Sequence, residues 1–292
     1  MPGINLWECT ESYPKVSIIL INWKNEKYTK PCVESLRKIT YPNYEIIIVD
    51  NESKGKLQYR DKRIRVVKSK HNLGFSIANN IGVHYATGEL VLILNNDTTV
   101  EPGFLQPLVK ELGEGAGMTT PLIFYPDGVL AYAGGRIKKY GTYHIGYGLD
   151  EAYANMLKVK DVDYATGCCL LMSKRLYQSL GGFDEYMFIY MEDIDLSIRV
   201  RRHGFAIRRV PESRIVHHEG MSTKHRNSRF FRRLGEHHIL YIAKKHGFLD
   251  REYLARDAAH AAKTIVESAI GDCFGEALGV IEGKIDYWRN WR

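Results

Sequence analysis

The sequence lacks any apolar run that approaches the ~18 residues a helix needs to cross a bilayer. Its first residues, MPGINLWECTESYPK, also lack the basic start and following apolar stretch of a secretory leader. We therefore expect a cytoplasmic protein that is neither secreted nor membrane-spanning. The chain contains no internal repeat, no low-complexity segment and no linker convincing enough to divide it.

Cysteine is scarce, and one common nucleotide motif is missing. The five cysteines are an odd number without C-x-x-C spacing, so we expect reduced thiols rather than a disulfide framework or a zinc site. They are Cys9, Cys32, Cys168, Cys169 and Cys273. The first apolar run is followed by NWKNEKY rather than G-x-G-x-x-G, which argues against a dinucleotide-dependent oxidoreductase.

The chain carries an excess of positive charge. Lysine and arginine number 41 against 34 acidic residues, so 41 − 34 gives a formal net charge of +7 over 292 residues. This excess suits anionic partners such as nucleotide phosphates, nucleic acid or an acidic membrane face, and alone it does not choose among them. The length suits one large α/β domain or two smaller ones.

The first hundred residues alternate between strand and helix patterns. Nearly continuous apolar runs of strand length occupy residues 16–22, 44–50, 63–68 and 89–95, as expected for strands covered on both faces. Helical stretches lie between them, at 27–40 and 74–88, and predict a parallel sheet. Ligands of such sheets bind beyond the carboxyl ends of the strands, which here carry Asn22 with Trp23, Asp50 with Asn51, and Asn95 to Asp97.

The pattern loosens after about residue 113. Residues 124–153 are rich in glycine and tyrosine and predict hairpins, and 162–173 predict a strand. A helix is expected to end at Gly204, followed by two short strands split by Pro211. From Asn227 onward the pattern is helical.

Three groups of residues are candidates for chemistry. Asp97 follows a buried strand and suits a hard cation with phosphate oxygens, although a helix N-cap or Asx-turn explains it equally well. Glu192 and Asp193 crowd the start of a helix; the helix dipole explains one acid better than two, so we infer that one has a functional role. Asp195 is spaced to pair with Arg199 and is interpreted as structural.

His217 and His218 form the third group. Neighbours on a strand point to opposite faces, so only one of them can share a site with Asp97. An imidazole with a carboxylate suits Mn²⁺ or Mg²⁺ when phosphates complete the coordination shell. A surface or core histidine without a ligand is the alternative.

Several motifs together resemble family 2 glycosyltransferases, especially rhamnosyl- and galactofuranosyltransferase-like members. They are VSIILINWKN, EIIIVDN, NLGFSIANNIG, LILNND, TGCCLL, LGGFDE, MEDIDLSIRVRRHG and IVHHEG, in the family's order and approximate spacing from residue 16 to about 246. The resemblance implies an α/β GT-A fold, with a mostly parallel central sheet flanked by helices and a C-terminal helical extension. It divides the chain into a catalytic domain at 1–225, with a nucleotide-binding half at 14–113 and an acceptor half at 114–225, and a helical region at 226–292.

The resemblance also implies an inverting transfer from a sugar nucleotide, with Mn²⁺ or Mg²⁺ held by an Asp-x-Asp-like motif. That motif falls on Asn95, Asn96 and Asp97, where the first acid is an amide, so the metal would depend on Asp97 and His217. Asp193, with Glu192 beside it, matches the catalytic position. Asp50 matches the residue that contacts uracil or thymine. Trp23 either stacks on that base or packs internally.

Further binding residues follow from the same motifs and from the basic and tyrosine-rich segments. The expected donor-binding residues are Asn22, Trp23, Asp50, Asn72, Gly74, Asn80, Asn95, Asn96, Asp97, Lys224 and Arg226, and the expected acceptor-binding residues are Tyr143, Tyr147, Gly167 and Cys168. A solvated basic helix face is the alternative for the segment around Lys224 and Arg226. A tyrosine-rich hairpin packed on its own domain is the alternative for the tyrosines.

The expected partners are a UDP- or dTDP-sugar donor and a saccharide or lipid-linked acceptor in cell-envelope polysaccharide or glycolipid synthesis. The C-terminal DYWRNWR is consistent with either a membrane-surface contact at the inner face of the cell membrane or a homodimer contact. We expect no nucleic-acid partner. A catalytically inactive glycosyltransferase-like protein, binding nucleotide or nucleic acid, is the alternative that Asn95 keeps open.

Overall fold

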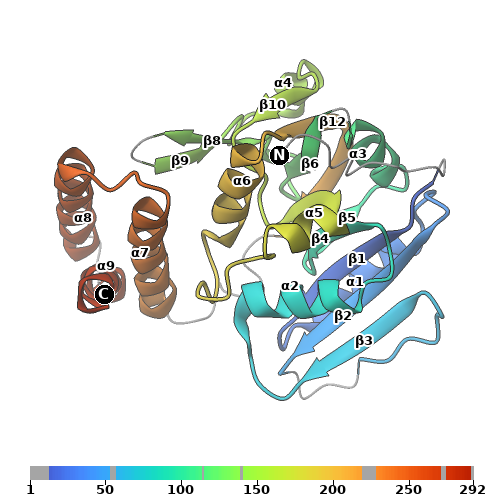
Figure 1. Cartoon of the computed structure of the whole chain (residues 1–292), viewed down its shortest axis with the longest axis horizontal. Coiled ribbons are helices and arrows are strands. Elements are labelled where there is room, and N and C mark those ends of the chain that lie inside the picture. The colour runs from blue at the N-terminus through green and yellow to red at the C-terminus, as the bar shows by residue number, and fades with distance from the viewer. Residues whose placement is uncertain are drawn as a thin grey trace.

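The computed structural model describes residues 13–52, 57–113, 115–138, 141–218, 228–270 and 274–290. Its centre is a ten-stranded mixed sheet with the order β10-β12-β6-β11-β4-β1-β2-β3, in which β5 also pairs with β12 and β7 with β6. Figure 1 shows the sheet with helices on both faces and the C-terminal helices beyond one side of it. This is the α/β architecture that the sequence predicts.

The strands of this sheet are β1 (Val16–Asn22), β2 (Tyr44–Asn51), β3 (Ile64–Ser69), β4 (Leu90–Asn95), β5 (Thr98–Val100), β6 (Ala116–Phe124), β7 (Leu130–Tyr132), β10 (Lys160–Val162), β11 (Cys169–Ser173) and β12 (Ala206–His217). Strands β3, β2, β1 and β4 are parallel, whereas β11 runs antiparallel to both β4 and β6. A separate hairpin consists of β8 (Gly135–Lys138) and β9 (Gly141–His144).

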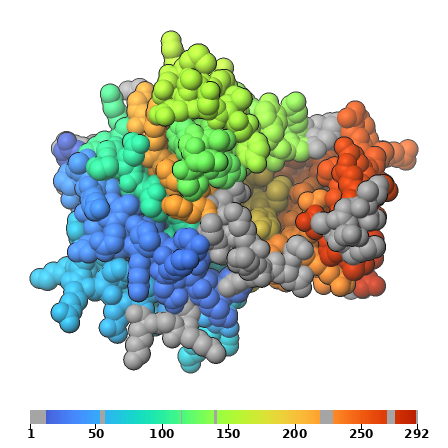
Figure 2. Space-filling view, turned by 180° about the vertical axis from the view of Figure 1, so that it is seen from behind, coloured from blue at the N-terminus to red at the C-terminus, as the bar shows by residue number. Residues whose placement is uncertain are grey.

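The helices are α1 (Glu26–Leu36), α2 (Gly74–Tyr85), α3 (Leu105–Glu111), α4 (Glu151–Asn155), α5 (Lys174–Ser179), α6 (Glu192–Arg202), α7 (Ser228–Lys245), α8 (Arg251–Ile270) and α9 (Phe274–Arg289). The last three confirm the helical C-terminal region, and Figure 2 shows them from behind at the opposite end of the molecule from the N-terminal strands. Among the described helices, none is both long and apolar enough to span a bilayer. The domain boundaries at residues 113 and 225 stay predictions.

The sheet is buried on both faces, which explains the continuous apolar runs of the sequence. In β1, Ile18 and Leu20 pack in one hydrophobic cluster with α1 and α3, and Ile19 packs in a second cluster with α2, α5 and α6. All three side chains are fully buried. Alternating side chains of a strand point to opposite faces, so a strand covered on both sides is apolar at nearly every position.

The expectation of two strands split by Pro211 is wrong, because β12 runs unbroken from Ala206 to His217. Its pairing with β6 shifts register between Val210 and Arg214. Proline has no N–H to donate, so it is tolerated in a strand where an irregularity removes the need for that donor. The irregularity lets one strand reach from the sheet interior to β5, where it ends at His217 beside Thr98.

Candidate active site

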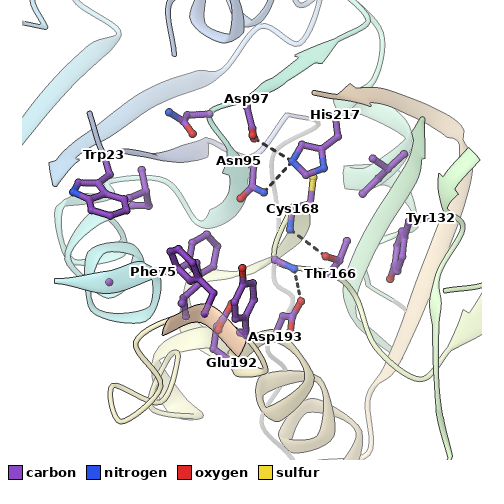
Figure 3. A pocket seen from close by; sticks show the side chains of 18 of the residues that line it. Trp23, Phe75, Asn95, Asp97, Tyr132, Thr166, Cys168, Glu192, Asp193 and His217 are labelled. Atoms are coloured by element: carbon purple, nitrogen blue, oxygen red, sulfur yellow. Dashed lines mark hydrogen bonds and ion pairs between the residues drawn. The ribbon is translucent and has the colours of Figure 1, made fainter. Parts of the chain in front are cut away.

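A cavity of about 450 Å³ lies beyond the carboxyl ends of β1, β2 and β4. Figure 3 shows side chains from both halves of the chain pointing into it. Most of the residues expected from the sequence line this cavity: Trp23, Asn72, Gly74, Asn95, Asn96, Asp97, Tyr147, Gly167, Cys168, Glu192, Asp193 and His217. The structure therefore gathers the turn after β4, the start of α6 and the end of β12 around a common space.

Asp97 and His217 face each other on one wall of the cavity. The pairing of β5 with the end of β12 brings them together, and His217 Nε2 lies 3.1 Å from Asp97 Oδ1 and 3.3 Å from Asn95 Nδ2 (Figure 3). Burial alone lowers the pKa of His217, but its contacts with Cys168 and Asp97 outweigh this and raise the pKa well above its ordinary value. Of the two neighbouring histidines, His217 is the one that lines the cavity.

The donor set of this wall fits part of a divalent-cation site. The cis ligands of an octahedral ion with bonds of about 2.1 Å stand about 3 Å apart, which matches the separation of Asp97 Oδ1 and His217 Nε2. In the described part of the chain, three or more His, Cys, Asp or Glu residues never gather in such an arrangement. Asp97 and His217 would therefore hold Mn²⁺ or Mg²⁺ only together with oxygens from a ligand or water, and the cation would have to displace the proton that the raised pKa favours on His217.

Asp193 lies at the start of α6, on another wall of the same cavity. Its Oδ2 accepts a hydrogen bond from the backbone N–H of Gly167 at 2.8 Å, and its Oδ1 accepts one from Ile194 at 2.8 Å. Burial raises its pKa despite these two hydrogen bonds. A carboxylate that is held rigidly and has a raised pKa is suited to accept a proton from a substrate.

Glu192 is buried beside Asp193 and also lines the cavity. Its Oε2 has no hydrogen-bond partner among the described residues. Burial and the neighbouring Asp193 raise its pKa well above the ordinary value. Because the preceding residues Tyr190 and Met191 have φ of 72° and 73°, left-handed values that strain non-glycine residues, the turn that presents both acids is held by its surroundings.

Asp195 does not line the cavity, and its ion pair with Arg199 confirms the structural interpretation. Its Oδ2 lies 2.6 Å from Arg199, and its Oδ1 lies 2.8 Å from both Lys245 and His246 of the α7 segment. The last residues of α7 and the residue after it therefore anchor α6. In the same region, His238 of α7 contacts the carbonyl oxygens of Ile189 and Tyr190 through Nδ1 at 3.0 and 3.2 Å.

The start of α2 forms the wall of the cavity that comes from the N-terminal, nucleotide-binding half of the chain. Asn51 donates through Nδ2 to Asn72 Oδ1 at 2.9 Å, and Asn72 Oδ1 also accepts from the N–H of Gly74 at 3.0 Å. Gly74 has φ of +80°, and a Cβ there would stand 2.4 Å from the carbonyl oxygen of Phe188. Only glycine allows this close approach between α2 and the loop that leads to α6.

Several residues expected at the site do not line the cavity. Asn22 and Asp50 are buried, and Asn22 Nδ2 donates a hydrogen bond to Asp50 Oδ1 at 2.9 Å. The neighbour of Asp50, Asn51, lines the cavity, and contact between Asp50 and a base stays a prediction. The side chain of Asn80 is hydrogen-bonded to Tyr177, Phe183 and Glu185, and so it holds the loop before α6. Tyr143 is exposed under the ammonium group of Lys138. Lys224 and Arg226 lie outside the described residues.

Sequence reasoning missed most of the aromatic lining. Phe75, Tyr125, Tyr132, His144, Phe188, Tyr190 and Phe231 also line the cavity, together with the hydroxyl residue Thr166. These residues lie in loops, short strands and helix starts, where no periodicity shows which way a side chain points. Asn51 lines the cavity as well, and its position at the end of a strand beside Asp50 indicated this from the sequence.

The chain matches the family described as Glycosyl transferase family 2 over residues 17–181, which is more than half of its length. The chain belongs to glycosyltransferase family 2. Asp193 and His217 lie beyond the matched range, so their assignment depends on the geometry of the cavity.

Among curated relatives of this glycosyltransferase, N-acetylglucosaminyl-diphospho-decaprenol L-rhamnosyltransferase of Mycobacterium tuberculosis is 26% identical over 236 residues, 70% of this chain and 76% of that protein. O-antigen biosynthesis protein RfbC of Myxococcus xanthus is 28% identical over 233 residues, 72% of this chain and 18% of RfbC. Uncharacterized protein y4gI of Sinorhizobium fredii is 29% identical over 270 residues, 85% of this chain. The chain spans 29% of y4gI and so corresponds to a small part of two of these relatives.

Two solved structures share the fold. The mannosyltransferase PcManGT of Pyrobaculum calidifontis, in complex with GDP-Man and Mn²⁺, has a TM-score of 0.61 at 15% identity and covers 95% of this chain and 88% of its own. GalNAc-T7 with UDP, GalNAc and Mn²⁺ has a TM-score of 0.60 at 18% identity and covers 80% of this chain and 48% of its own. The glycosyltransferase therefore has the GT-A fold.

Proposed function

We propose that this glycosyltransferase moves a sugar from a UDP- or dTDP-linked donor to a hydroxyl of a saccharide or lipid-linked acceptor, with inversion at the anomeric carbon. The observation that carries the proposal is that one cavity is lined by Asp97, His217 and Asp193. The first two suit the diphosphate end of a donor, and the third suits the acceptor hydroxyl. The name of the rhamnosyltransferase and the role of RfbC in O-antigen biosynthesis support an acceptor from cell-envelope polysaccharide or glycolipid synthesis.

In the proposed reaction, Asp193 accepts the proton of the acceptor hydroxyl while that oxygen attacks the anomeric carbon. The bond from the anomeric carbon to the diphosphate oxygen breaks, and the nucleoside diphosphate leaves. The hydrogen bonds from Gly167 and Ile194 fix the Asp193 carboxylate for this role. A divalent cation at Asp97 and His217 would neutralise charge on the departing diphosphate.

The other walls have complementary roles in the proposal. Trp23, Asn51 and Asn72 lie on the donor side, where amide groups can hydrogen-bond a base, ribose or phosphate without adding charge. Tyr147 and His144 are exposed on the acceptor side, and rings of this kind can stack on the apolar faces of sugars.

A donor and acceptor screen with product mass spectrometry tests the activity, and Asp193→Asn tests the mechanism. We expect D193N to lose transfer by at least about a thousandfold because the base is gone, while UDP affinity measured by calorimetry stays within about twofold. Asp161→Asn, an exposed acid on β10, is the matched control and should retain full turnover. Near-normal turnover of D193N would reject the assignment.

Asp97→Ala tests the diphosphate side separately. We expect it to remove most of the gain in UDP affinity that Mn²⁺ provides, because the only carboxylate of the proposed pair is lost. Equal UDP affinity of D97A and the unaltered protein, with and without Mn²⁺, would take Asp97 out of the metal site.

A further inference from the structure

The last helix, α9, has its large apolar side chains on the outside. It packs against α7 and α8 (Figure 1). Four large apolar side chains of α9 are nevertheless 39–46% exposed: Leu278, Ile281, Ile285 and Trp288. The buried positions of the helix are mostly small and include Ala277, Gly279 and Gly283. A surface helix normally has the reverse arrangement, with its large apolar residues toward the core.

The two glycines explain how α9 packs without its large side chains. A Cβ on Gly279 would stand 2.6 Å from the carbonyl oxygen of Arg229, and a Cβ on Gly283 would stand 2.4 Å from that of Arg233. The backbones of α7 and α9 therefore approach closely, as small residues at a helix contact allow. The contact with α7 uses this glycine face and leaves the four large side chains on the opposite side of α9.

The four exposed side chains form a continuous row, which we call the α9 stripe. Steps of three, four and three residues separate Leu278, Ile281, Ile285 and Trp288. This is the a and d spacing of a heptad, with which one helix packs against another. Isolated apolar side chains are common on protein surfaces, whereas a contiguous apolar patch marks an interaction site. The spacing therefore indicates that a second helix covers the stripe.

The charges beside the stripe do not suit an anionic membrane surface. α9 carries three acids and two bases, so 2 − 3 gives −1, whereas helices that lie on membranes are rich in lysine and arginine. Most of these charges are also neutralised by ion pairs with α7 and α8, which are Glu282–Arg229, Asp286–Arg233, Lys284–Glu236 and Lys284–Asp257. The stripe is thus an apolar row between charges that are already paired.

We propose that the α9 stripe is a dimer interface, in which α9 of one copy packs against α9 of a second copy across a two-fold axis. Such a contact needs a face that is complementary to itself. A row of apolar side chains between internally paired charges meets this condition. None of the described residues that line the catalytic cavity lies on α9, so both cavities of the dimer stay open. The interface does not depend on the proposed function.

Sedimentation velocity of the full chain between about 1 and 100 µM tests the proposal, because four side chains make an interface smaller than the standard size. We expect the mass of the particle to double across this range. Ile281→Glu together with Ile285→Glu places like charges at the centre of the contact and should weaken the dimer by at least about a hundredfold. Met156→Glu, at a side chain that is 70% exposed after α4, is the control and should keep the dimer.

A mixing experiment tests whether α9 faces α9. I281E/I285E and I281K/I285K should each be monomeric and keep the Tm of the unaltered chain, since both positions are exposed. An equal mixture of the two should recover the dimer, because opposite charges then meet across the axis. A mixture that stays monomeric would overturn the contact, and so would an unaltered chain that is monomeric throughout the concentration range. A monomer that sediments with phosphatidylglycerol vesicles, and fails to do so as I281E/I285E, would assign the stripe to a membrane surface instead.

Discussion

Glu192 is the least satisfied acid of the catalytic cavity, because its Oε2 has no hydrogen-bond partner among the described residues. Burial raises its pKa in the folded state, so the folded chain holds this proton over a pH range where the unfolded chain has released it. Stability therefore falls as pH rises above about 4.3, the ordinary pKa of glutamate, and continues to fall until the folded pKa is passed.

Glu192→Gln removes that pH dependence while keeping the shape of the side chain. We expect E192Q to raise Tm more at pH 8 than at pH 5, with each 1 kcal/mol of gain corresponding to about 2–4 °C. Thermal unfolding at both pH values measures this. Glu267→Gln, at an exposed position of α8, should give the same small difference at both. A larger gain for E192Q at pH 5 would contradict the assigned direction.

Asn95 stands where the family pattern has an acid, and its amide lies 3.3 Å from His217 Nε2. Asn95→Asp places a second carboxylate beside Asp97. We expect a lower Tm without metal because like charges repel, and Mn²⁺ binding that is tighter by about tenfold, or 1.4 kcal/mol. Calorimetry with Mn²⁺ measures the gain, and Asn95→Ala controls for loss of the amide. Unchanged Mn²⁺ affinity in N95D would show that residue 95 lies outside the cation's reach.

At the scale of elements, α6 is held by α7, and Asp195 is the centre of that contact. Its side chain is fully buried and bonded to Arg199, Lys245 and His246, which together hold its pKa well below the ordinary value although burial opposes them. Its stabilising contribution is present above the unfolded pKa of about 3.9 and is lost as pH falls through the lower folded pKa.

Asp195→Asn should destabilise the protein by about 1.5–3 kcal/mol at pH 7, because Arg199 loses its carboxylate partner and the buried His246 loses a charged hydrogen-bond partner, whereas the exposed Lys245 keeps Asp184. Chemical denaturation measures this. The exposed pair of Glu252 and Arg256 on α8 provides the comparison, and Glu252→Gln should cost less than about 1 kcal/mol. Similar losses in the two variants would show that the buried network adds little.

His238 connects the same helix to catalysis, because it holds the carbonyls of Ile189 and Tyr190 just before the acids of α6. We expect His238→Ala to lower kcat by up to about a hundredfold, since displacement of a reacting group by 1 Å is enough for this, with little change in donor KM. His238→Asn, which keeps a donor near the Nδ1 position, should recover part of the loss. A change in Tm without a change in kcat would reduce His238 to a structural residue.

The elements could be predicted where one physical rule dominates. The apolar runs of β1, β2 and β4 show strands buried on both faces, and the polar residues after them mark the ligand edge. The prediction of two strands split by Pro211 was wrong because the sequence does not reveal that β12 accommodates the proline by a register shift. The expected contact of Asp50 with a base stays a prediction, because sequence does not show that its carboxylate accepts a hydrogen bond from the buried Asn22 and does not line the cavity.

At the scale of the whole molecule, the catalytic cavity is lined from both halves of the chain. Trp23, Asn72 and Asp97 come from the first half, whereas Asp193, His217 and Phe231 come from the second. The ten-stranded sheet brings these residues together although they are far apart in the sequence. The order of the motifs could identify the polar residues of both halves. The position of an aromatic residue such as Phe231 depends on how α7 packs, and no sequence pattern predicts it.

A ligand that contacts both halves should stabilise the whole fold. We expect UDP with Mn²⁺ to raise Tm more than the sum of their separate effects, because each completes the binding site of the other. At a hundred times Kd the stabilisation is about 2.7 kcal/mol. Thermal unfolding with UDP, Mn²⁺, both, and both plus EDTA measures this. Chelation should remove the excess, which is the rise in Tm beyond the sum of the two separate effects. D97A should lack this excess, whereas D161N should keep it. An excess that survives EDTA would show that UDP binds through the amide and aromatic walls alone, with no cation between it and Asp97.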